Sequence, residues 1–223
     1  MKARALPLAA TLLGLITLVV FVMLSASDAV RASYEPGQVG AAVSQFQRAE
    51  TPADIARLFG TPPDAAKIAA MDAINTLDLW AFIPAYALFL SAAALMLGGL
   101  SNRWTQIAML FALAGAFFDA IETWKQLQLT ADIANAETHL PIAPWHWLKY
   151  AALALNGVAI ASLCITAARK RWALTVAALL PLPLVLASYV DLLSTRAFAA
   201  AFALYWIALL AVAALELLRP RLA

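Results

Sequence analysis

The sequence predicts an all-α protein: a polytopic membrane helical bundle with six transmembrane helices and with the N- and C-termini in the cytoplasm. Hydrophobic residues make up 64% of the 223 residues and charged residues only 13%, whereas soluble domains carry roughly 25% charged residues. The apolar residues also fall in blocks of about twenty, the length of a helix that crosses roughly 30 Å of hydrocarbon. This composition excludes a soluble enzyme and a disordered chain.

The apolar blocks divide residues 1–223, which we expect to form one membrane domain, into six spans. The first block follows Lys2 and Arg4, as a secretory signal would. Its apolar stretch is longer than the roughly 7–15 residues of a signal peptide, so we expect a retained anchor. The predicted spans are residues 5–26, 76–97, 104–124, 147–167, 172–190 and 197–217.

The charged residues predict the orientation of these spans. With both termini in the cytoplasm, the cytoplasmic side carries eight basic residues and one acid, and the other side carries seven basic and twelve acidic residues. The positive-inside rule favours this arrangement. We therefore expect a multi-pass protein of the inner membrane of a bacterial cell, with the lipid bilayer and possible further membrane subunits as partners. The net charge of +2 is too small to indicate a nucleic-acid partner.

The longest segment outside the spans, residues 27–75, is predicted to be extracytoplasmic and to contain two short helices. Residues 51–54 and 61–64 each begin with Thr-Pro and end with Asp. This pattern is typical of a helix start, because Thr caps free N–H groups, Pro suits the first turn and Asp favours the positive end of the helix dipole. The predicted helices end at Gly60 and near Asn75, and lie on the outer membrane face or simply pack on the bundle.

The second extracytoplasmic loop, residues 125–146, contains the carboxylates Asp132 and Glu137 and the imidazoles His139 and His146. Such side chains can bind metals, but their spacing matches no metal motif, so we expect solvated loop polarity, no metal and no cofactor. The single cysteine, Cys164, excludes an intramolecular disulfide.

Ionisable residues inside the spans give the candidate site, because they are costly in lipid and usually face the bundle interior or a cavity. Two acids on the third span are three residues apart and share a helix face, and a lysine and an asparagine on the fourth are seven apart. We predict one acidic polar pocket that opens outwards. Its ligand- or proton-binding residues are Asp78, Asp119, Glu122, Lys149 and Asn156, and its rim is Trp80, Trp124, Trp147 and Tyr150.

Prolines inside two spans predict bends. Pro84 lies in the second span, and Pro181 and Pro183 lie in the fifth. Each proline removes a backbone donor from a helix, and such breaks are tolerated where neighbours or a cavity satisfy the freed carbonyls. Breaks at matching positions of two halves occur in transporters.

Three functions are compatible with this pattern. In the first, the pocket binds or translocates a small cation or an amphipathic ligand, with Asp119 and Glu122 as acceptors and Lys149 as their counter-ion. In the second, the chain is a non-catalytic accessory or assembly subunit of a membrane complex, and the same residues fix the helix register. In the third, the two acids serve a lipid-modifying enzyme as an acid–base pair, although no nucleophile or metal accompanies them. We therefore assign no catalytic residues.

Overall fold

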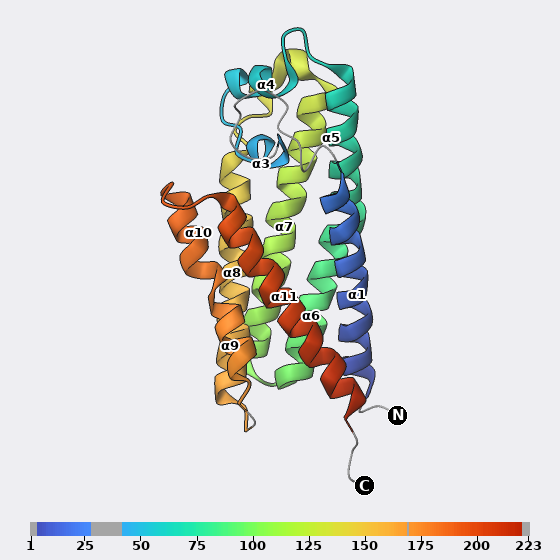
Figure 1. The fold of residues 1–223 in the computed structure, drawn as a ribbon, viewed down its shortest axis with the longest axis vertical. Coiled ribbons are helices and arrows are strands. Elements are labelled where there is room, and N and C mark those ends of the chain that lie inside the picture. Colours follow the sequence, from blue (N-terminus) through green and yellow to red (C-terminus); the bar gives the residue numbers. More distant parts are fainter. Residues whose placement is uncertain (1–3, 28–41, 169, 220–223) are drawn as a thin grey trace. The chain divides into compact units, whose positions relative to one another are not determined.

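The computed structural model describes residues 4–27, 42–168 and 170–219, and within these ranges every regular element is helical (Figure 1). Among the residues described, six helices are long and apolar enough to cross a membrane, the same number as the predicted spans. Lys2, Arg31, Arg169 and Arg221, used for the predicted orientation, lie outside the described residues. The six helices are Ala5–Ala26, Ala65–Gly98, Arg103–Ala131, Ala143–Thr166, Trp172–Tyr189 and Thr195–Leu218.

The second long helix begins earlier than predicted. It consists of α5 (Ala65–Leu77), the π-helical turn η2 (Asp78–Phe82) and α6 (Ile83–Gly98) without a break. The predicted surface helix ending near Asn75 is therefore the first part of the span-length helix, because neither glycine nor proline follows it before Pro84.

Pro84 explains the wide turn η2. A proline has no N–H group and cannot bond the carbonyl of the residue four positions earlier. The chain adapts by widening one turn, in which Ile83 N–H donates to the carbonyl of Asp78, five residues earlier. The helix therefore continues through Pro84 without the predicted break. Single π turns of this kind occur often at functional sites.

The fifth span is divided by its prolines, as predicted. It consists of α9 (Trp172–Leu179) and α10 (Pro181–Tyr189), joined at Leu180. Pro181 and Pro183 each remove one intrahelical donor at this joint.

The remaining helices are α1 (Ala5–Ala26), α7 (Arg103–Ala131), α8 (Ala143–Thr166) and α11 (Thr195–Leu218). The helix α7 continues beyond the predicted end of the third span because no glycine or proline interrupts it there. Much of the predicted second loop is therefore helical, and the short 3₁₀ helix η3 (Ile133–Thr138) follows α7.

The chain forms two compact units. Unit 1 contains residues 1–17, 85–116 and 150–223, and unit 2 contains residues 18–84 and 117–149. In unit 1, α11 packs against both α9 and α10.

Unit 2 contains a small helical cap, which we define as residues 42–64 and 132–142. Its elements are α3 (Ala42–Phe46), α4 (Pro52–Phe59) and η3. The rings of Phe46 and Phe59 meet edge to face with centroids 5.3 Å apart. The cap shares one buried apolar cluster with parts of α5 and α7: Ala42, Phe46, Ala49, Ile55, Leu58, Phe59, Met71, Leu129, Ala136 and Ile142.

The helix start predicted at Thr51 is confirmed, whereas the start predicted at Thr61 is wrong by three residues. At α4, Thr51 accepts from the Asp54 N–H while the Asp54 carboxylate accepts from the Thr51 N–H, and the helix ends at Gly60 as predicted. At α5, Asp64 is the cap instead of Thr61, and its carboxylate accepts from two backbone N–H groups of the first turn. Aspartate takes this role because the helix starts only after the second proline of the Thr-Pro-Pro-Asp segment.

The α4 cap makes the stability of this helix depend on pH. Burial would raise the pKa of Asp54, but hydrogen bonds from the Glu50 and Thr51 backbone, from the Thr51 hydroxyl and the nearby Arg57 charge together lower that pKa. A carboxyl whose pKa is lowered by folding stabilises the folded state above its unfolded pKa, and this contribution is lost as the pH falls.

We therefore expect hydrogen exchange of the α4 amides, corrected for intrinsic rates, to accelerate below about pH 4. Asp54→Asn removes this dependence and accelerates exchange already at neutral pH, whereas the matched control Glu50→Gln keeps the wild-type profile. An unchanged pH profile in Asp54→Asn would contradict the assignment.

Candidate functional site

Two acids on α7 face two basic side chains on α8 within unit 2. The Lys149 Nζ atom lies 2.9 Å from Asp119 Oδ1 and 2.7 Å from Glu122 Oε2. The His146 Nδ1 atom lies 3.6 Å from the other carboxylate oxygen of Glu122. We call Asp119, Glu122, His146 and Lys149 the ionic cluster.

The helix period explains how these four side chains meet. Asp119 and Glu122 are three residues apart on α7, and His146 and Lys149 are three apart on α8, so each pair shares one helix face. A step of three residues forward on α7 leads from Asp119 to Glu122. The corresponding step on α8 runs backward, from Lys149 to His146. This is the register of two antiparallel helices, and it places both pairs at the same level.

The ionic cluster is removed from the surface. The exposed fractions are 4% for Asp119, 0% for Glu122, 1% for His146 and 4% for Lys149. Desolvation of buried charges costs several kcal/mol per ion and is offset only by close pairing. Lys149 provides that pairing for both carboxylates. The cluster thus combines two carboxylates with one ammonium group and one imidazole.

Asp78 is a third carboxylate near the cluster. Its Oδ2 atom accepts from the Thr123 hydroxyl at 3.0 Å, and its charge interacts with those of Asp119 and Lys149. It begins the π-helical turn η2 and is half-buried. The predicted set Asp78, Asp119, Glu122 and Lys149 therefore comes together within unit 2.

Asn156 belongs to unit 1 and is engaged there. Its Nδ2 group donates to the Ala108 carbonyl at 2.8 Å, and its Oδ1 accepts from the Tyr205 hydroxyl at 2.8 Å. These bonds link α8 to α7 and to α11 in the buried interior. Because both ends of the amide have partners there, we leave Asn156 out of the candidate site.

The four predicted rim residues have different environments. Trp80 and Trp124 are 74% and 53% exposed, as expected for side chains that meet lipid headgroups. Trp147 is half-buried and packs edge to face on His146, with centroids 5.0 Å apart. Tyr150 belongs to unit 1, where its ring lies 4.5 Å from that of Phe198.

Sequence reasoning missed His146 and Thr123. The prediction that His146 lies in a solvated loop is wrong, because α8 begins at Ala143 and includes this residue. The missed signal was spacing, because His146 precedes Lys149 by three residues and shares its face. Thr123 directly follows Glu122, and nothing in its sequence context singled it out.

The arrangement of the cluster also bears on metal binding. Lys149 already occupies the cation position between the two carboxylates. Among the described residues, no group of three or more His, Cys, Asp or Glu side chains is arranged to hold a metal.

Comparisons with known proteins give no family: no protein-family model, curated protein or solved structure matches the chain. The site must therefore be interpreted from its own geometry.

Proposed function

We propose that this protein is a multi-pass membrane protein that binds a small cation, a proton, at the ionic cluster and translocates it. The observation that carries the proposal is that Lys149 bridges two buried carboxylates while His146 faces one of them. Ionisable groups placed within spans are expensive and often mark proton relays. Buried charges are costly, and proton uptake by a buried carboxylate removes its charge.

The proposal includes an orientation with both termini in the cytoplasm of a cell with an inner membrane. The predicted threading places four basic residues at the cytoplasmic ends of the helices: Arg103, Lys170, Arg171 and Arg219. It places the cap residues Glu50, Asp54 and Asp64 on the extracytoplasmic side. This distribution follows the positive-inside rule.

Infrared spectroscopy during pH titration tests proton binding, because a protonated carboxyl group has its own C=O band. We expect the wild-type protein to show a titrating carboxyl band that shrinks in Asp119→Asn or Glu122→Gln. Asp132→Asn, which changes an exposed carboxylate of the same unit, is the matched control and should keep the band. Identical titrating bands in all four proteins would refute the proposed site.

Translocation is tested separately in proteoliposomes that contain a pH-sensitive dye. An imposed pH gradient should decay faster with wild-type protein than with Glu122→Gln or with empty vesicles. Equal decay in the three samples, together with a normal carboxyl band, would restrict the proposal to binding.

A second candidate, an accessory or assembly subunit, is favoured by one observation: Lys149 lies within ion-pair distance of both carboxylates in the same chain. Such internal pairing fixes the register of α7 against α8 without any ligand. This candidate predicts stoichiometric co-purification of other membrane subunits and no carboxyl band that depends on the cluster.

A further inference from the structure

We propose a second binding site, on the cap, for a small primary ammonium compound with a short apolar body. It is independent of the ionic cluster and of the proposed function. The site is a pocket of about 290 Å³ between α4, the turn that follows α4, and η3. Small-molecule pockets span roughly 300–1,000 Å³, so the volume indicates a ligand at the small end of this range.

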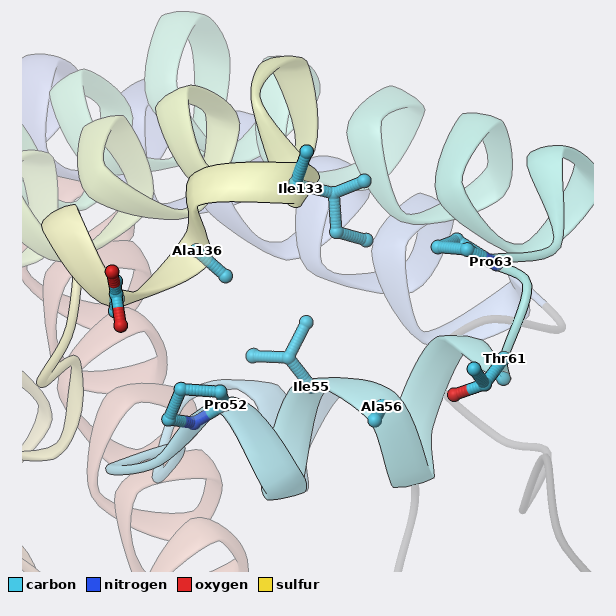
Figure 2. A pocket seen from close by; sticks show the side chains of 10 residues that line it. Pro52, Ile55, Ala56, Thr61, Pro63, Ile133 and Ala136 are labelled. Atoms are coloured by element: carbon cyan, nitrogen blue, oxygen red, sulfur yellow. The ribbon is translucent and has the colours of Figure 1, made fainter.

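Two apolar walls face each other across the pocket. Pro52, Ile55 and Ala56 come from α4, and Ile133 and Ala136 come from η3 (Figure 2). Pro52 and Ala56 are exposed and Ile133 is half-buried, so these three side chains offer aliphatic surface for a ligand body of a few carbon atoms. Burial of apolar surface contributes about 25 cal/mol per Å².

The walls are anchored in the cap core, so the pocket is formed before a ligand arrives. Ile55 and Ala136 belong to the buried apolar cluster of unit 2. The Ile142 N–H donates to the Ala49 carbonyl at 2.9 Å and ties the chain after η3 to the segment before α4. A preformed pocket avoids the ordering cost that weakens binding to mobile surfaces.

The polar groups of the pocket decide the ligand class. Glu137 is the one charged side chain of its lining, and Thr61 contributes a hydroxyl group. Among the described residues, Glu137 forms no ion pair. A cationic group is complementary to this carboxylate, and an ammonium group can donate a charge-assisted hydrogen bond to it.

The lining also argues against a quaternary ammonium ligand. Recognition of such cations relies on aromatic rings, and the pocket lining contains none. A primary ammonium group donates directly to Glu137, while an alkyl body of four or five carbons contacts Pro52, Ala56 and Ile133. This assigns the pocket to small aliphatic amines.

The experiment compares three probes of the same shape, isopentylammonium, isopentanol and isovalerate, by saturation-transfer NMR titration of the purified full chain. We expect isopentylammonium to bind at least tenfold more tightly than isopentanol, and isovalerate not to bind. Glu137→Gln should weaken isopentylammonium at least tenfold and leave isopentanol unchanged. Ala56→Phe, at an exposed position of α4, should fill the pocket and abolish binding of both.

Glu50→Gln, an exposed carboxylate outside the pocket lining, is the matched control and should bind isopentylammonium as the wild type does. The proposal is overturned if isovalerate binds as tightly as isopentylammonium, or if Glu137→Gln and Ala56→Phe bind the amine with wild-type affinity. Retained α4 amide protection in each variant shows that the cap is folded. Binding here with no titrating carboxyl band at the ionic cluster would refute the proposed function and leave this site intact.

Discussion

Replacement of Lys149 by methionine is expected to destabilise the folded protein by about 3–5 kcal/mol, the cost of removing one partner from a buried ion pair. Methionine keeps the length and the apolar stem of the lysine side chain but removes its charge. Asp119 and Glu122 are then left buried without their counter-ion, although the lysine amine lies within 3 Å of both carboxylates in the native protein. The measurement is equilibrium unfolding of the purified protein in mixed micelles.

Two further variants show whether charge is the cause. Lys125→Met changes a half-buried lysine on α7 that makes no ion pair among the described residues, and it should alter stability by no more than about 0.5 kcal/mol. The triple variant Asp119→Asn, Glu122→Gln and Lys149→Met removes all three charges and should recover most of the loss. A single Lys149→Met variant as stable as the wild type would show that the cluster does not hold the helices together.

The second large effect is expected at Gly157, where α8 and α9 come close in unit 1. A Cβ atom at this position would lie 2.3 Å from the Ala178 carbonyl oxygen. This neighbour is backbone and cannot rotate away, so Gly157→Ala forces the two helices apart. We expect a loss of about 1–3 kcal/mol, typical of an overpacked interior.

Gly115→Ala provides the matched control on α7. Its Cβ would lie 2.7 Å from a methyl carbon of Leu153, which is the flexible end of a side chain. Leu153 can move by changing rotamer, and alanine favours the helix over glycine by about 1 kcal/mol. We therefore expect Gly115→Ala to be far less costly than Gly157→Ala in the same unfolding measurement. If Gly157→Ala instead stabilised the protein by its helix propensity, the close approach of α8 to α9 would be disproved.

The number of spans and the first span were predictable because hydrophobic length is a local property of the chain. The ends of α5 and α7 were harder to predict. Both helices continue into polar sequence, since the segments before Thr76 and after Trp124 lack helix-breaking residues. Apolar content defines where lipid can be crossed, but it does not define where a helix starts or stops.

For the candidate site, the shared face of Asp119 and Glu122 followed from their spacing alone. The grouping with Lys149 followed from the threading of the spans. His146 could not be assigned until the start of α8 was known, because the predicted span begins at residue 147 whereas the helix begins at Ala143. Asn156 shares a helix face with Lys149 by spacing, yet it bonds to Ala108 and Tyr205 in unit 1.

By itself, the sequence determined the all-helical class, the count of membrane-length helices and the position of the acids on one helix face, because each depends on residues within a few turns of one another. Only the tertiary structure decided that one ammonium group bridges two carboxylates, that a histidine completes the cluster and that the cap encloses a pocket. These features depend on which helices pack together and in what register, and that choice is made by contacts between residues far apart in the chain.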